Sequence, residues 1–352
     1  MKVYYNPDYK KNNNGLVDAL LACGCEILDN NYSLYRIDKI LQTDLFVFNW
    51  FENIYKGPKG LVEFLKRIII LMIIKICRKK VMFCIHNRQP HIKNYEKPNI
   101  ILSHILLLYI ITLSDYVIML SKKTIESFSK KDQIFLNKKK AKFFYLPHRD
   151  FSDLYIESNL NTTQANELRM LFLGPAEVYK NPELLIKVMN RLCDKPIYLT
   201  FEGKCDSFMK EKLQLLNKNK NVLLNFSYIP DKNLASEFSK YDICIYPLSL
   251  DCCINSSSVL LAWSLHKSVV CSEVSTLQEL PSCLNYGYSY ETINEHEEKL
   301  YKTILKVYEE KNNNPLVLRQ KGDKCAELLH INNNQEMINK IIKEILHIKD
   351  RI

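Results

Sequence analysis

A chain of 352 residues, 47% of them hydrophobic, is long and apolar enough for two globular domains, which excludes an intrinsically disordered protein. Its formal net charge of +10 favours an anionic partner, such as a nucleotide, a nucleic acid or an acidic membrane. The eight glycines form neither a G-x-G-x-x-G motif nor a P-loop, which excludes the usual dinucleotide and Walker-type phosphate loops.

The twelve cysteines are scattered along the chain without a Cys-x-x-Cys pair. The closest pairs are Cys23/Cys25 and Cys252/Cys253, and neither spacing suits a zinc knuckle, so we predict no metal site. Because no secretory signal follows Met1, we expect reduced cysteines and a cytoplasmic protein.

Predicted strands and helices alternate through the first part of the chain, a pattern typical of a parallel α/β sheet. Strands are predicted over residues 2–5, 26–28, 45–48, 81–85, 116–120 and 143–146, and helices over 16–23, 60–80 and the first part of 100–120.

Polar side chains follow two of these strands, at the edge where open parallel sheets bind ligands. Glu52 comes shortly after the strand 45–48. The cluster from His86 to His91 follows the strand 81–85. A single histidine in this position is more often structural, but the cluster makes His86 and His91 candidate general bases, with Glu52 behind them.

The segment 66–80 combines a short apolar run with basic residues on both sides. The run is too short to span a bilayer. Two interpretations stay open for it: a core helix with solvated ends, or a helix that lies on an anionic membrane surface without crossing it.

The second half of the chain repeats the α/β alternation after a polar stretch, 157–167, that we predict to be a linker. Strands are predicted over residues 169–173, 197–202, 222–226, 242–246 and 268–271, helices over 182–192, 232–240, 259–265, 292–311 and 335–348, and loops at 312–314 and 332–334.

Four consecutive capping residues, Asn255, Ser256, Ser257 and Ser258, stand just before the apolar helix 259–265. Such residues are common helix caps, so one interpretation is an ordinary capped helix between two strands. The amino end of a helix also attracts anions, phosphate above all. We therefore predict a phosphate site at this helix.

The order of tyrosine-proline, the serine-rich loop, helix, strand and Glu279 resembles the donor-binding core of two-domain GT-B glycosyltransferases. It is similar to a divergent bacterial branch of family-4-like enzymes with a serine-rich donor loop. The two glutamates that many retaining members carry are replaced here by Cys253 and Leu261. The resemblance implies two Rossmann-like α/β domains that face each other across a cleft.

Further matches carry the resemblance into both predicted domains. His86 corresponds to the histidine of the acceptor domain, and His148 falls in a turn that touches the nucleotide or the cleft. Gly174 and Lys180 match the strand-ending glycine and the lysine that neutralises the donor diphosphate. The implied domains are an acceptor-side domain, 1–160, and a donor domain, 168–330, with a closing helix, 335–352, that can pack back on the first domain.

The resemblance implies transfer of a hexosyl group from a nucleoside diphosphate sugar to a glycan or lipid-linked saccharide in surface polysaccharide synthesis. We expect no cofactor besides this donor and no metal dependence, since no Asp-x-Asp motif is present. The alternatives are a nucleotide-sugar epimerase on the same fold and a non-catalytic nucleotide-sugar-binding scaffold. Nucleic acid is not an expected partner, because the basic residues do not interleave with aromatic ones. We expect the protein at the inner face of the cell membrane.

Overall fold

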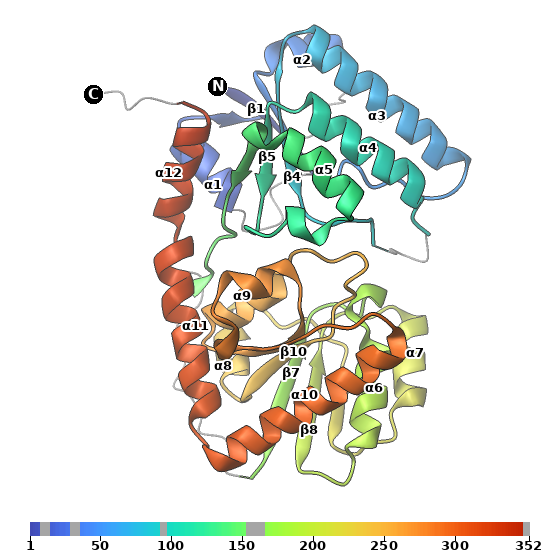
Figure 1. The fold of residues 1–352 in the computed structure, drawn as a ribbon, viewed down its shortest axis with the longest axis vertical. Helices are drawn as coiled ribbons and strands as arrows, with labels where there is room; N and C mark the ends of the chain where they lie inside the picture. Colours follow the sequence, from blue (N-terminus) through green and yellow to red (C-terminus); the bar gives the residue numbers. More distant parts are fainter. Residues whose placement is uncertain (8–14, 29–35, 92–96, 153–165, 348–352) are drawn as a thin grey trace. The chain divides into compact units, whose positions relative to one another are not determined.

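The computed structural model describes residues 1–7, 15–28, 36–91, 97–152 and 166–347. These residues form two compact units (Figure 1). Unit 1 contains Met1–Arg149, Asp251–Asn255 and Asn333–Ile352, and unit 2 contains Asp150–Leu250 and Ser256–Asn332. The chain therefore contributes three separate segments to unit 1, and one of them is only five residues long.

Unit 1 is built on a parallel six-stranded sheet with the order β2-β1-β3-β4-β5-β6. Its strands are nearly continuous runs of apolar residues because helices cover both faces. The strands are β1 (Lys2–Asn6), β2 (Glu26–Ile27), β3 (Leu45–Asn49), β4 (Lys80–Ile85), β5 (Tyr116–Met119) and β6 (Phe143–Tyr145), and the helices are α1 (Gly15–Ala22), α2 (Ile37–Gln42), α3 (Pro58–Ile76), α4 (Ile100–Leu113), α5 (Lys130–Lys138) and α12 (Gln335–Ile345).

Alternate residues of these strands face two separate cores. On one face, Phe46, Phe48 and Phe83 pack with residues of α3 and α4, which lie side by side in Figure 1. On the other face, Val47 and Met82 pack with residues of α1 and α12. Because these strands are paired in parallel, the carboxyl ends of β1, β3 and β4 lie at one edge of the sheet.

Unit 2 contains a second parallel six-stranded sheet, with the order β12-β11-β10-β7-β8-β9. Its main core joins the sheet to α6 and α10, and a buried ion pair of 2.7 Å links Lys311 to Asp242 at the start of β10. The strands are β7 (Leu168–Leu173), β8 (Ile197–Glu202), β9 (Val222–Asn225), β10 (Ile243–Tyr246), β11 (Val269–Ser272) and β12 (Tyr286–Tyr288), and the helices are α6 (Pro182–Arg191), α7 (Ser207–Leu216), α8 (Leu234–Phe238), α9 (Ser257–Ser264), α10 (Ile293–Asn313) and α11 (Val317–Asn333).

The structure confirms the predicted α/β architecture with two parallel sheets. The predicted loops over 312–314 and 332–334 were wrong for all but their last residues. Helix α10 continues to Asn313, and α11 continues to Asn333, where only Asn334 separates it from α12 by capping that helix. Most of the predicted linker lies outside the described residues. Within the described part of the chain, no helix has the length and apolar character needed to cross a membrane.

Candidate functional site

A row of hydrogen bonds crosses the carboxyl edge of the unit 1 sheet. Asn49 Nδ2 donates to the backbone oxygen of Asn6 at 3.0 Å, and Asn49 Oδ1 lies 2.9 Å from His86 Nε2. Asn6 ends β1, Asn49 ends β3, and His86 comes directly after β4. Since these strands are neighbours, the row fixes the His86 imidazole at the edge where parallel sheets bind ligands.

The hydrogen-bond row also assigns the tautomer of His86. The carbonyl of Asn6 can only accept, so the Asn49 nitrogen faces it, and Asn49 Oδ1 accepts from His86 Nε2. His86 Nδ1 therefore carries the lone pair. Burial lowers the pKa of His86 to about 3, with a smaller contribution from His148. The ring is neutral at physiological pH, and it stacks on Trp50 with 4.1 Å between the ring centroids.

Glu52 lies in the turn that follows β3 and is only 4% exposed. Its Oε2 atom has no hydrogen-bond partner among the residues that the structure describes. Burial raises the pKa of Glu52 to about 7, although a backbone hydrogen bond and the charge of Arg67 act in the opposite direction. Arg67 orders the turn by donating to the backbone oxygens of Phe51 and Asn53. The result is a fixed carboxyl group that exchanges its proton near neutral pH.

The two other predicted histidines of unit 1 have different surroundings. His148 is half-buried after β6, burial lowers its pKa, and its backbone oxygen accepts a hydrogen bond of 2.9 Å from Asn333. His148 is close enough to His86 to lower the pKa of that ring. His91 is half-buried, with Nδ1 3.3 Å from the sulfur of Cys252. The structure thus brings His148 near His86 and brings His91 to a cysteine.

In unit 2, the predicted serine run forms the start of α9. Ser256 is the N-cap: its Oγ accepts from the Val259 nitrogen at 3.4 Å, and its own nitrogen donates to Thr276 Oγ1 at 3.0 Å. Ser257 is exposed and Ser258 is half-buried in the first turn. The first N–H groups of a helix carry a partial positive charge. One serine therefore caps the helix, and the other two belong to its first turn.

Lys180 brings a full positive charge to the same helix start. Its side chain is buried, with Nζ 3.5 Å from Ser258 Oγ and 5.9 Å from the centre of the Phe172 ring. Gly174 makes room for it: a Cβ at this position would lie 2.4 Å from Lys180 Nζ, and the φ of +128° is one that residues with side chains rarely adopt. The glycine that ends β7 and the lysine therefore form one structural feature.

The two other predicted donor-site residues of this region, Asn255 and Glu279, do not belong to the start of α9. Asn255 belongs to unit 1, where its Nδ2 lies 3.3 Å from the His86 oxygen and 3.5 Å from that of Ile85. Its amide nitrogen thus faces backbone carbonyls of unit 1. Glu279 is half-buried at the end of a short 3-10 helix, Ser275–Glu279, which follows β11.

Sequence reasoning missed the parts played by Asn49, Arg67 and Thr276. Asn49 orients His86, Arg67 orders the Glu52 turn, and Thr276 holds the backbone of Ser256. The available signal was an asparagine as the last residue of a buried strand, because a buried amide needs partners on both sides. Arg67 and Thr276 gave no signal for these parts, since the backbone groups that they order are distant in sequence.

The fold that carries these groups is similar to several solved structures. The structure of Anabaena Alr3699/HepE in complex with UDP and glucose has a TM-score of 0.66 and 12% identity, covering 98% of this chain and 99% of that one. Sucrose-phosphate synthase from Thermosynechococcus elongatus has a TM-score of 0.67 and 13% identity, covering 99% and 98%. A glycosyltransferase from Rickettsia africae has a TM-score of 0.57 and 14% identity, covering 98% and 90%.

These similarities define the class of fold. The chain has the GT-B fold of the glycosyltransferases named above, as the sequence predicted. Neither a protein-family model nor a curated protein sequence matches the chain. At 12–14% identity the likeness concerns the fold, so the argument for a reaction comes from the residues.

Proposed function

We propose that the protein is a glycosyltransferase that uses a nucleoside diphosphate sugar as its donor. The observation that carries this proposal is the buried ammonium of Lys180, 3.5 Å from Ser258 at the start of α9. A lysine charge and a helix amino end together favour a ligand with more than one negative charge, and a diphosphate has that character. The same groups would stabilise a departing diphosphate during transfer.

Unit 1 would supply the acceptor side of the reaction, with a base for the acceptor hydroxyl if the sugar is transferred with inversion. A general base works best when its pKa is near the working pH. Glu52, with a pKa of about 7, meets this condition, whereas His86, with a pKa of about 3, is a weak base. We therefore assign the base to Glu52 and a hydrogen-bonding role to His86 through its Nδ1 lone pair. His91 is the weakest candidate, because its Nδ1 faces Cys252.

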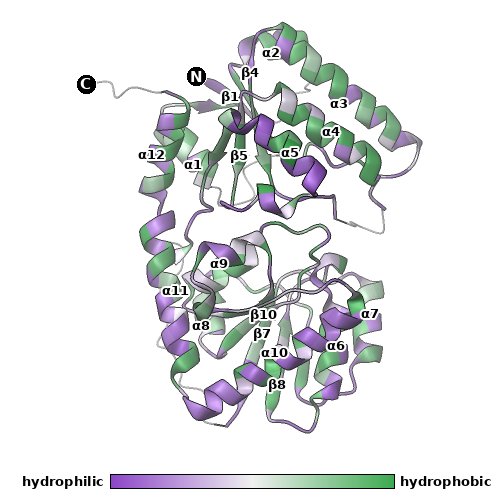
Figure 2. Ribbon diagram, in the orientation of Figure 1, coloured by the Kyte–Doolittle hydropathy of each residue, from purple (hydrophilic) through white to green (hydrophobic). Residues whose placement is uncertain are grey.

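The acceptor we propose is a lipid-linked saccharide, because unit 1 exposes an apolar surface bordered by basic residues. Figure 2 shows hydrophobic residues along much of α3 and α4. Lys59, Lys66 and Arg78 are exposed at or near α3. We call this the α3–α4 surface; its exposed apolar residues are Leu61, Val62, Leu65, Ile69, Met72 and Ile76 of α3 and Ile100, Ile101 and Ile105 of α4.

The α3–α4 surface favours the membrane interpretation of the segment 66–80 over the solvated core helix. α3 buries Phe64 and Ile74 and still leaves a second apolar stripe in contact with solvent. A helix that only packs on a sheet would carry polar residues there. Apolar side chains flanked by lysines suit the boundary of an anionic bilayer. Such a location, on the inner face of the cell membrane, fits a role in surface polysaccharide synthesis.

Vesicle flotation tests the membrane part of this proposal. The protein should float with anionic vesicles at low salt, and less at high salt, because salt screens charges beyond about 8–10 Å. Leu65→Glu/Ile69→Glu should lower the bound fraction at least about tenfold, because both side chains are half-exposed in the apolar stripe. The matched control is Leu215→Glu/Leu223→Glu in unit 2, where both residues are also exposed. Equal binding of the two double variants would contradict the assignment.

Incubation with UDP-, GDP- and TDP-sugars tests the reaction itself. Slow release of free sugar, and transfer to an added lipid-linked saccharide without a divalent metal ion, is the result expected of a transferase. Interconversion of sugars without release would identify an epimerase instead. Binding without turnover would identify a scaffold, in line with Cys253 and Leu261 at the positions of the usual glutamates.

A further inference from the structure

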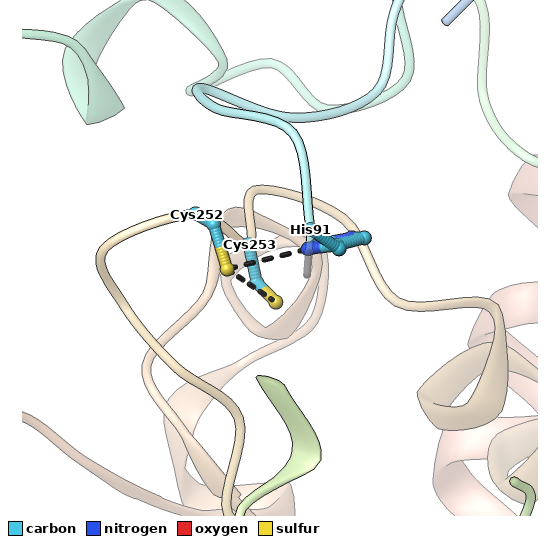
Figure 3. A group of neighbouring side chains, drawn as sticks. All are labelled: His91, Cys252 and Cys253. Atoms are coloured by element: carbon cyan, nitrogen blue, oxygen red, sulfur yellow. Dashed lines mark hydrogen bonds between the residues drawn. The ribbon is translucent and has the colours of Figure 1, made fainter. Parts of the chain in front are cut away.

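Three side chains with metal-binding atoms, His91, Cys252 and Cys253, meet in unit 1 (Figure 3). His91 Nδ1 lies 3.3 Å from Cys252 Sγ, and Cys252 Sγ lies 3.9 Å from Cys253 Sγ. All three ligand atoms are within 4.8 Å of one another. Cys253 is buried, whereas Cys252 and His91 are half-buried, so an ion can reach the group from solvent.

Two of the three separations are close to those in a tetrahedral zinc site, and the third, between His91 and Cys253, is at most 4.8 Å. Zinc binds sulfur at about 2.3 Å and imidazole nitrogen at about 2.0–2.1 Å, which places two sulfurs about 3.8 Å apart and sulfur and nitrogen about 3.6 Å apart. The two measured separations, 3.9 Å and 3.3 Å, differ from these values by only a few tenths of an ångström. Small side-chain rotations would therefore complete the geometry.

Backbone contacts hold the two cysteines in place without help from an ion. Cys253 forms an antiparallel bridge with Asn87, and the Arg88 nitrogen donates to the Cys252 oxygen at 3.0 Å. The next residue, Ile254, is fully buried in the core shared with α3 and α4. A ligand set that is positioned in advance loses little conformational freedom when it binds a metal.

We propose that His91, Cys252 and Cys253 bind a zinc ion in a site with three protein ligands and a fourth, open position. The cysteines would bind as thiolates and release their protons, and the two thiolates would balance the charge of the ion. His91 would bind through Nδ1, the atom that faces Cys252. The ion would hold Cys252 and Cys253 against His91 within unit 1.

Cobalt titration of the full chain, purified with a phosphine reductant, tests the site. We expect one equivalent of Co²⁺ to bind with the intense near-ultraviolet absorption of thiolate coordination, and Zn²⁺ to displace it. Cys252→Ser and Cys253→Ser should each weaken binding by more than the roughly 10–100-fold that loss of an outer hydrogen-bond partner causes. His91→Gln should keep part of the thiolate absorption and weaken binding in the same direction.

Matched controls are Cys193→Ser and Cys283→Ser, because both cysteines are exposed and lie outside the group. Zinc should raise the melting temperature of the wild type and of both controls, but not that of the Cys252 or Cys253 variants. Three results would overturn the proposal: no thiolate absorption in the wild type, equal loss in the control variants, or a protein mass showing that Cys252 and Cys253 form a disulfide under reducing conditions.

Discussion

Replacing Glu52 with glutamine should make the protein more stable at neutral pH, although Glu52 is the base that we propose. The neutral amide has nearly the shape of the protonated carboxyl group, so Glu52→Gln removes the ionisation and little else. Burial raises the pKa of Glu52 from the usual 4.5 to about 7. Between these two values the folded protein holds a proton that the unfolded chain has released. Stability is therefore lost as pH rises through this window.

The size of the effect follows from the two pKa values. A difference of about 2.5 pKa units corresponds to roughly 3 kcal/mol at pH values above the window and to less than about 0.5 kcal/mol near pH 4. A gain of roughly 3 kcal/mol is large beside the 5–15 kcal/mol that typically separates folded from unfolded protein. Glu52→Gln should therefore match the wild type near pH 4 and exceed it in free energy of unfolding near pH 8.

Urea denaturation followed by fluorescence measures this difference within unit 1. The chain has two tryptophans, Trp50 in unit 1 and Trp263 in α9, so a Trp263→Phe background leaves Trp50 as the reporter beside Glu52. The control is Glu26→Gln on the exposed side of β2, which should show no such pH dependence. If Glu52→Gln is destabilising near pH 8, or equally stabilising at both pH values, the carboxyl group is not the buried, ionising group described above.

Four further predictions concern the other candidate residues. Lys180→Met should weaken nucleoside diphosphate binding at least about tenfold in calorimetry, about 1.4 kcal/mol, whereas the exposed Lys187→Met in α6 should not. Gly174→Ala should also weaken nucleoside diphosphate binding. The variant with both Gly174→Ala and Lys180→Met should lose less binding free energy than the sum of the two single losses, because the alanine methyl group and the lysine ammonium compete for one space. Fully additive losses would refute this coupling. Ser256→Ala should cost about 1 kcal/mol of stability in thermal unfolding; an unchanged melting temperature would contradict its capping role. The wild-type free energy of unfolding should fall as pH drops from 6.5, the usual histidine pKa, toward 3, because the unfolded chain takes up a proton on His86 that the folded protein does not. In urea titrations, His86→Gln should lose less stability over this range. An unchanged slope of stability against pH would show that the ring is not buried.

The sheets and the strand ends could be predicted because their signals are local. A parallel strand buried on both faces is a short apolar run, and the residue after it reaches the carboxyl edge wherever the strand lies in the sheet. Glu52, His86 and Gly174 were predicted to follow strands in this way, and they do. The pKa of Glu52 could not be predicted, because it depends on packing around a turn that Arg67 orders from α3.

The cysteine cluster shows the limit of local signals more clearly. Cys252 and Cys253 are adjacent in sequence, but His91 lies 161 residues before Cys252. The spacing rules for zinc sites presuppose ligands from one or two neighbouring loops. Here the ligands meet because the segment Asp251–Asn255 leaves unit 2 and joins the core of unit 1 through Ile254. Only the three-dimensional structure contains that information.

The buried carboxyl groups Asp242 and Glu52 differ in their partners, and this difference bears on stability and function. Directly before β10, the buried side chain of Asp242 lies 2.7 Å from the ammonium of Lys311, so each group has an oppositely charged partner that offsets part of its desolvation cost. At the opposite, carboxyl end of a strand, Glu52 has an oxygen without a hydrogen-bond partner in the described part of the chain. Folding alone gives no reason to keep a carboxylate there, because we expect glutamine to stabilise the same turn near neutral pH. The proposed transfer provides a reason to keep it, because a general base must exchange a proton with its substrate near neutral pH.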